Sequence, residues 1–181
     1  MAKRKIIRLV CRPMDWEKDR TDKGSMCAKE IRKAIESMSP FKLKPIGVLV
    51  EEGFDPNVNV PSEDLDYEVL YEGKRIAVID PTCSNYTFEE SMIMPVNYYK
   101  GEIIKRLDVP AFMVYSMEKE KRPLADRCMW IHGKDVIKCK PEWRYLGGKD
   151  QHNYMTNKPD WHRGLQSLIK ELLKIRIIFG A

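Results

Sequence analysis

A predicted β-hairpin over residues 65–80 constrains the fold of this chain more than any other feature. Leu65 to Tyr71 and Arg75 to Asp80 are rich in aliphatic, β-branched and aromatic residues, which favour strands. The connection Glu72-Gly73-Lys74 contains a glycine that can adopt the positive φ of a tight turn. We expect this hairpin in the middle of a sheet, with the buried-looking segment 110–117 alongside and a helix over residues 95–107 covering one face.

The remaining segments alternate between strand and helix patterns. Apolar residues at steps of three and four predict helices over residues 25–38 and 163–178. Further predicted elements are strands over 5–11 and 46–50, a second hairpin over 129–132 and 135–139, and irregular segments over 13–23, 53–63 and 141–160. This order predicts an α/β or α+β fold, with a mixed central sheet flanked by helices.

The length of 181 residues suits one domain over residues 1–181, with a sizeable buried core. Hydrophobic residues make up 43% and charged residues 33% of the chain, as in an ordinary globular protein. No apolar run approaches the roughly 18 residues that span a bilayer, so we expect no membrane association. Arg8 and Arg12 interrupt the apolar N-terminal stretch, which argues against a signal peptide and for a cytoplasmic location.

The cysteines and the net charge set weaker limits on function. The five cysteines are widely spread, without the Cys-x-x-Cys or Cys/His spacing of zinc sites, and are interpreted as thiols in a reducing compartment. The net charge of +5 permits nucleic-acid binding but does not demand it, because 32 basic residues are interleaved with 27 acidic ones.

Acidic residues at the hairpin suggest a metal site. Asp66 opens the first strand and Asp80 ends the second, so the hairpin brings them into neighbouring strands. A carboxylate that ends a buried strand is costly unless it is paired, hydrogen-bonded or bound to a cation. Carboxylates are the ligands that Mg²⁺ prefers, and such an ion can activate water and neutralise charge at a phosphate. We therefore predict that Asp66 and Asp80 hold magnesium.

The run from Asp66 to Thr82, Asp-Tyr-Glu-Val-Leu-Tyr-Glu-Gly-Lys-Arg-Ile-Ala-Val-Ile-Asp-Pro-Thr, resembles the core hairpin of the PD-(D/E)XK nuclease superfamily. That family has a helix, a three-strand meander, a helix and a further strand, and the predicted order over residues 25–117 is similar. The resemblance implies a restriction-endonuclease-like core, with residues 128–181 as an extension. It also implies that Asp66 and Asp80 are the magnesium ligands of a nuclease.

The chain departs from the family pattern at two places. Thr82 stands where the family has a lysine two residues after the second acid, and no proline precedes Asp66. Some family members draw the lysine from the following helix, a role that Lys100 matches. The family often adds a glutamate from its first helix, which Glu30 matches. Both residues border the inward-facing stripes of their predicted helices.

Each of these residues also has a simpler interpretation. Asp80 with Pro81 and Thr82 could form a strand-ending turn in which the aspartate accepts backbone N–H groups. Glu30 could be a solvated helix charge, and Lys100 a surface lysine whose apolar stem lies along the protein.

The C-terminal third interleaves basic and aromatic residues, as on a surface where cations meet phosphates and rings stack on bases. These residues are Lys138, Lys140, Trp143, Arg144, Tyr145, Lys149, Tyr154, Lys158, Trp161, His162 and Arg163. We predict that Arg144, Lys149 and Arg163 contact nucleic acid. A partly buried loop region is the alternative interpretation.

Two functional hypotheses follow from the sequence. The first is a magnesium-dependent endonuclease or exonuclease acting on DNA or RNA, in which Asp66 and Asp80 hold the metal, Glu30 supports it and Lys100 stabilises the transition-state charge. The second is a non-catalytic protein of similar fold that binds nucleic acid or a protein partner, which Thr82 favours. The sequence leaves a homodimer open.

Overall fold

The computed structural model describes residues 16–46, 65–91, 93–146 and 149–179. The strand predicted over residues 5–11 and the loop predicted over residues 53–63 lie outside this part of the chain.

The described residues form short strands and helices in alternation. The helices are α1 (Trp16–Met38), α2 (Tyr98–Ile104), α3 (Leu124–Arg127), α4 (Gly133–Val136) and α5 (Leu165–Phe179), with a 3₁₀ turn at Lys158–Asp160. The strands are β1 (Lys42–Pro45), β2 (Tyr67–Tyr71), β3 (Lys74–Ser84), β4 (Ile93–Asn97), β5 (Ala111–Met117), β6 (Cys128–His132), β7 (Pro141–Leu146), β8 (Lys149–Asn157) and β9 (His162–Arg163).

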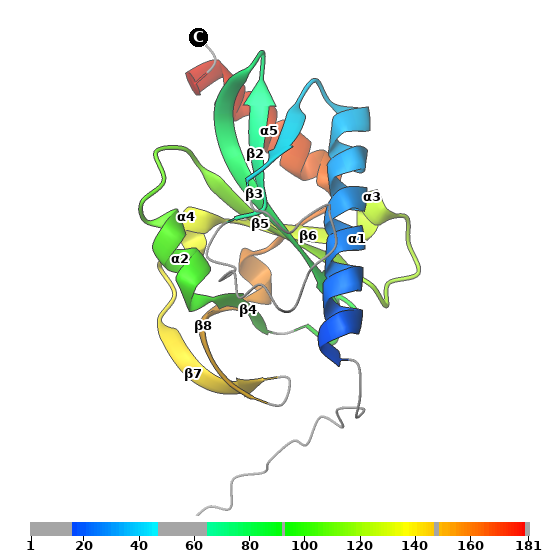
Figure 1. Ribbon diagram of the computed structural model, residues 1–181, viewed down its shortest axis with the longest axis vertical. Coiled ribbons are helices and arrows are strands. Elements are labelled where there is room, and N and C mark those ends of the chain that lie inside the picture. Colours follow the sequence, from blue (N-terminus) through cyan, green and yellow to red (C-terminus); the bar gives the residue numbers. More distant parts are fainter. Residues whose placement is uncertain (1–15, 47–64, 92, 147–148, 180–181) are drawn as a thin grey trace, which may run out of the picture.

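A mixed six-stranded sheet forms the centre of the molecule, in the order β1-β2-β3-β5-β6-β9 (Figure 1). β3 and β5 run parallel, whereas the other neighbouring strands are antiparallel. A smaller antiparallel sheet has the order β4-β8-β7. The predicted α/β class, with a mixed central sheet flanked by helices, is confirmed.

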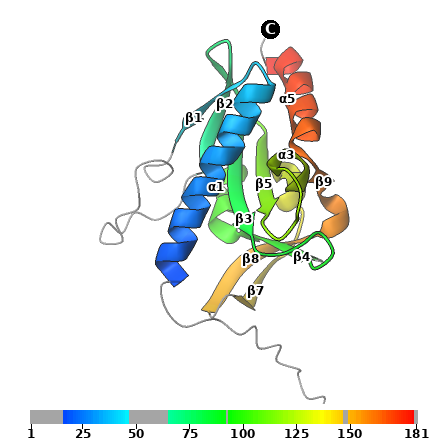
Figure 2. The same ribbon diagram turned by 90° about the vertical axis from the view of Figure 1, so that its right-hand side faces the viewer.

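Two apolar cores lie on the two faces of the central sheet. On one face, α1 and α5 bury residues such as Ile31 and Leu168 against the sheet. On the other face, α2, α4 and the smaller sheet bury residues such as Ile104, Val136 and Tyr154. Figure 2 shows α1 in front of β3, and both views place the β7–β8 hairpin at the end of the molecule away from the C-terminus. The sheet is therefore covered on both faces.

The hairpin predicted over residues 65–80 is confirmed. β2 and β3 pair antiparallel, with Tyr67 opposite Ile79 and Glu68 opposite Val78. Glu72 and Gly73 form the turn with positive φ values of 49° and 79°, the backbone of a tight two-residue hairpin loop. β5 lies alongside β3, as expected for residues 110–117.

The helix predicted over residues 95–107 is shorter than expected. Residues 93–97 form β4, and α2 begins at Tyr98, where the Asn97 side chain accepts a hydrogen bond from the backbone N–H of Tyr99. β4 is an edge strand paired only with β8, which tolerates a proline at position 95. The apolar stripe expected on this helix included Tyr99, which is instead 62% exposed.

Three other predictions need correction. The segment 141–160, predicted to be irregular, forms the β7–β8 hairpin. The second predicted hairpin is absent, since β6 runs directly into α4 at residues 133–136. Helix α1 starts at Trp16, within the segment 13–23 that was predicted to be irregular.

A strand not predicted from the sequence, β1, directly precedes the segment 46–50 that was predicted as a strand. β1 occupies residues 42–45, and its burial alternates, with Leu43 buried between two exposed lysines. Ile46 lies outside the strand, and residues 47–50 lie outside the described part of the chain. Because lysines flank Leu43, this segment contains few apolar residues, and its composition did not predict a strand.

Candidate active site

Asp80 is a buried carboxylate in the middle of the central sheet. It lies in β3 opposite Met113 of β5, and only 2% of its surface is exposed. Alternation along the strand places its side chain on the same face as Val78, which packs in the core beneath α2 and α4. A carboxylate at such a position requires a partner.

Lys100 supplies that partner from α2. Its ammonium nitrogen donates to both carboxylate oxygens of Asp80, over 2.7 and 2.6 Å. The two side chains are 21% and 3% exposed, so the ion pair is largely removed from solvent. Such short, charge-assisted hydrogen bonds fix the lysine over the sheet. The alternative interpretations of Lys100 as a surface lysine and of Asp80 as a turn-capping residue do not describe this contact.

Gly101 sets how closely α2 approaches the smaller sheet. A Cβ atom at this position would lie 2.1 Å from Cε2 of Tyr154 in β8, which is far too close for two non-bonded carbon atoms. Glycine therefore allows the helix to rest on the tyrosine ring. This contact determines the position from which the neighbouring Lys100 reaches Asp80.

Asp66 directly precedes β2. Its carbonyl oxygen accepts the backbone N–H of Ile46 over 3.0 Å, which holds the residue beside β1. The last paired residues of β2 and β3 at this end are Tyr67 and Ile79, and Asp66 and Asp80 are their neighbours in the chain. The hairpin thus brings both predicted metal ligands to the same end of the β2–β3 pair.

The electrostatics of Asp66 reflect this position. Burial raises the pKa of Asp66 to about 7, and the negative charge of Asp80 adds to the effect while Lys100 opposes it. With both aspartates ionised, the two carboxylates and one ammonium carry a net charge of −1. The site therefore attracts either a proton or a cation near neutral pH.

The residues present fit a magnesium ion. Two carboxylates at the same end of the β2–β3 pair are a donor set that Mg²⁺ accepts, with waters filling the other positions. A cation would also relieve the repulsion that raises the pKa of Asp66. Thr82 lies two residues after Asp80 on the same face and is partly buried, but it carries no charge.

Glu30 lies apart from this group. It is exposed, on the helix that covers the opposite face of the sheet, and its carboxylate lies 4.0 Å from the guanidinium of Arg127. The inward stripe of α1 runs through Cys27 and Ile31, and Glu30 projects beside it. The geometry agrees with a solvated helix charge and not with a ligand next to Asp80.

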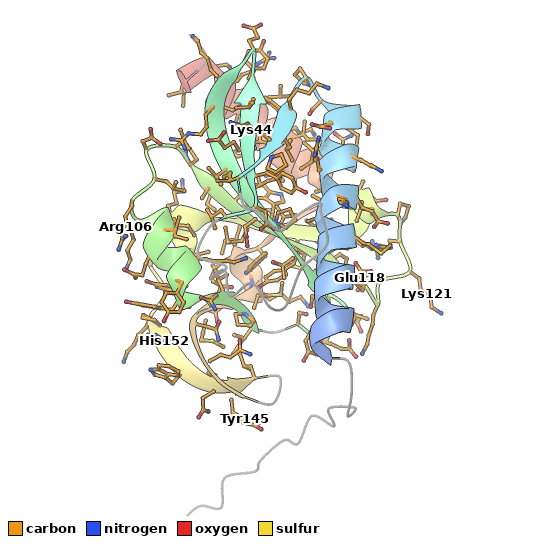
Figure 3. All side chains as sticks on the ribbon, in the orientation of Figure 1. Lys44, Arg106, Glu118, Lys121, Tyr145 and His152 are labelled. Atoms are coloured by element: carbon orange, nitrogen blue, oxygen red, sulfur yellow. The ribbon has the colours of Figure 1, made fainter. Side chains whose placement is uncertain are left out.

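An aromatic ladder extends from α2 onto the β7–β8 hairpin. We use this name for Tyr154, Tyr98, His152 and Trp143, whose consecutive ring centroids lie 5.8, 4.2 and 4.9 Å apart with interplanar angles of 10°, 20° and 3°. Trp143 is 69% exposed at its outer end. Figure 3 shows His152 on this hairpin below α2. Tyr98, which belongs to the ladder, lies two residues before Lys100 in α2.

Arg144 and Arg163, two of the three basic residues predicted to contact nucleic acid, lie in different sheets. Arg144 of β7 donates to Glu142 over 3.0 and 2.7 Å, and alternation places it on the face opposite Trp143. Arg163 lies in β9 at the edge of the other sheet, with its guanidinium 4.3 Å from the centroid of the Phe88 ring. The side chain of Lys149 lies outside the described part of the chain.

A second group of polar side chains escaped the sequence argument. The sulfur atoms of Cys27 and Cys83 and a carboxylate oxygen of Glu118 all lie within 4.8 Å of one another. These residues belong to α1, to the end of β3 and to the residue after β5, so no local spacing signals them. Only the tertiary fold brings them together.

Comparison of the chain with protein-family models, with curated proteins and with solved structures finds no match. Among the helices of the described residues, none has the length and apolar character needed to cross a membrane.

Proposed function

We propose that this chain is a metal-dependent phosphodiesterase acting on nucleic acid. The observation that carries the proposal is the buried ion pair of Asp80 and Lys100, with Asp66 at the same end of the β2–β3 hairpin. Two carboxylates and one ammonium group in a largely buried position suit a reaction in which charge develops at a phosphate.

The order of elements supports the same proposal. Helix α1, the antiparallel strands β1, β2 and β3, helix α2 and strand β5 follow one another as in the nuclease superfamily that the hairpin resembles, with β4 as an addition before α2. β5 lies parallel to β3, so the connection through α2 crosses one face of the sheet and carries Lys100 over Asp80.

Asp66 and Asp80 would hold the metal in this proposal. A bound magnesium ion supplies activation of water and neutralisation of charge at the phosphate. Lys100 would stabilise negative charge that develops on the phosphate oxygens once Asp80 no longer engages it fully. Asp66, with a pKa near 7, binds the cation only after it loses its proton, so activity should rise from pH 6 to pH 8.

The aromatic ladder supports nucleic acid as the substrate. An exposed ring at the end of a stacked series offers a flat apolar face on which a base can stack, at about 1–3 kcal/mol per base. Because Tyr98 and Lys100 belong to the same helix, a strand stacked on Trp143 would run towards the carboxylates. The overall charge of +5 favours a polyanion.

One observation favours the non-catalytic hypothesis. Lys100 engages both oxygens of Asp80, which would suffice to explain both residues as a structural ion pair. In that case the hairpin and the aromatic ladder would bind nucleic acid without cleaving it.

Cleavage of labelled DNA and RNA separates the two hypotheses. The wild type should cleave in the presence of Mg²⁺ or Mn²⁺ and stop when the metal is chelated. Asp80→Asn should lose cleavage, whereas Lys105→Met, an exposed substitution on the same helix, should retain it. Binding without cleavage under every metal condition would support the non-catalytic hypothesis.

A further inference from the structure

A compact group of thiols lies on the face of the central sheet that α1 covers. Cys27 and Cys128 are buried, Cys83 is partly buried, and the carboxylate of Glu118 is 36% exposed. One sulfur atom of Cys27, one of Cys83 and one oxygen of Glu118 lie within 4.8 Å of one another. Cys128, at the start of β6, lies in the same core but outside this 4.8 Å group.

The spacing of these groups suits a tetrahedral metal ion. Zinc binds sulfur at about 2.3 Å and carboxylate oxygen at about 2.0–2.2 Å, so its ligand atoms lie roughly 3.5–4 Å apart. Small rotations of the Cys27, Cys83 and Glu118 side chains would bring their atoms to this spacing. The group offers three donors, and a water molecule would complete a tetrahedral site.

The Cys27 thiol holds its proton when no metal is bound, because the hydrogen bond with Cys83, followed by burial, raises its pKa far above the usual range. A soft divalent cation binds the thiolate and displaces that proton to solvent.

The neighbours of Glu118 are arranged to orient it. The Ser116 hydroxyl donates to Glu118 Oε1 over 2.6 Å, and the guanidinium of Arg127 approaches the same oxygen to 3.4 Å. Hydrogen bonds of this kind fix the direction of a ligating carboxylate. The positive charge of Arg127 also offsets the excess negative charge that thiolates and a carboxylate would bring to a divalent ion.

This group is separate from the carboxylates around Asp80. Cys83 and Asp80 both belong to β3, but they lie three residues apart and point to opposite faces of the sheet. Figure 3 shows Glu118 beside α1, on the other side of the molecule from His152. The exposed carboxylate and the partly exposed Cys83 leave an ion a path from solvent.

We infer that Cys27, Cys83 and Glu118 form a binding site for a soft divalent metal ion such as Zn²⁺. The ion would tie α1 to the ends of β3 and β5. This site does not depend on the proposed nuclease activity. Buried cysteines that merely fill the core, as small apolar side chains, are the competing explanation.

Cobalt titration of the full-length, reduced and metal-free protein tests this inference. Co²⁺ should bind one ion per chain with an absorption band from thiolate-to-cobalt charge transfer, and Zn²⁺ should abolish the band while Mg²⁺ should not. Cys27→Ser should weaken Zn²⁺ binding at least tenfold, by loss of a ligand. Cys139→Ser, a substitution of a partly buried cysteine in the opposite core, should leave binding unchanged.

A second variant keeps the test decisive if Cys27→Ser does not fold. Glu118→Gln alters a partly exposed side chain and should weaken Zn²⁺ binding about tenfold. Absence of the charge-transfer band would overturn the inference, as would equal affinity of the wild type and Glu118→Gln.

Discussion

Lys100 holds both carboxylate oxygens of Asp80, over 2.7 and 2.6 Å, and thereby joins α2 to the middle of the central sheet. A cation that binds Asp80 must share these oxygens with the ammonium group or displace it. The ion pair therefore occupies the proposed metal site when no metal is bound. A catalytic role and a structural role of this pair predict different responses to added metal.

Replacement of Lys100 by methionine tests this exchange. The variant leaves Asp80 buried without its ammonium partner, so the free energy of unfolding should fall by about 3–5 kcal/mol, as for other broken buried pairs. Added Mg²⁺ should restore more stability to the variant than it adds to the wild type, because the ion takes over the positive charge. Denaturant titrations of both proteins with and without Mg²⁺ measure this difference.

Lys105→Met serves as the matched control. Lys105 lies on the same helix, but its partner Glu102 is near the surface, and the variant should lose far less stability than Lys100→Met. Equal responses of the Lys100 and Lys105 variants to Mg²⁺ would show that the metal does not act at Asp80.

The pKa of Asp66 predicts a distinctive dependence of stability on pH. Because this pKa is about 7 in the folded chain against a usual value of 3.8, the folded state binds more protons between these values. The contribution of Asp66 to stability is therefore complete below about pH 4 and is lost as the pH rises through 7, by an amount on the order of 4 kcal/mol. The difference in unfolding free energy between Asp66→Asn and the wild type, measured from pH 5 to pH 8, should grow in favour of the variant. A constant difference across this range would contradict the burial of Asp66 beside Asp80.

Gly101→Ala should disturb the site without altering a charge. The added methyl group would collide with the ring of Tyr154, so α2 or the tyrosine must move. We expect a loss of roughly 1–3 kcal/mol, as for other overpacked positions, together with reduced cleavage. Tyr154→Leu introduced into the Gly101→Ala variant should recover part of both losses by making room, which denaturation and cleavage assays of the double variant would reveal. No recovery would mean that the ring does not set the position of α2.

Trp143 is predicted to be the outer stacking position for a base. Trp143→Ala should weaken binding of a single-stranded oligonucleotide about tenfold in the absence of metal, consistent with the loss of one stacked base. Ile178→Ala provides the control, since Ile178 is also exposed, at 73%, but lies on α5. Fluorescence anisotropy of a labelled oligonucleotide gives both affinities. If the two variants bind like the wild type, the aromatic ladder is not the binding surface.

The sequence predicted the elements whose signals are local. The alternation of residues in the hairpin and the turn at Gly73 predicted that Asp66 and Asp80 lie in neighbouring strands, and the resemblance to the nuclease superfamily pointed to Lys100 on the following helix. β4 was missed because Pro95 suggested a helix start, although an edge strand also accepts proline. The β7–β8 hairpin was missed because its exposed aromatic and basic residues do not alternate in polarity as a half-buried strand does.

The remaining features depend on tertiary structure. Glu30 borders the inward stripe of α1, and only the packing of that helix on the opposite face of the sheet separates it from Asp80. The approach of Cys27 to Cys83 and Glu118 joins residues more than thirty positions apart in the chain. Neither a helical period nor a cysteine spacing contains that information.

The most direct test of the proposed metal site is the melting temperature of the wild type and of Asp66→Asn at pH 8 as Mg²⁺ is added. Mg²⁺ is a hard cation and should not bind the thiols. The wild type should melt at higher temperature as Mg²⁺ increases, because the ion binds only the folded state. Asp66→Asn should start at an equal or higher melting temperature, since it lacks the carboxylate repulsion, and should gain nothing from Mg²⁺. A wild type that does not respond to Mg²⁺, or a variant that responds equally, would contradict a magnesium site at Asp66 and Asp80.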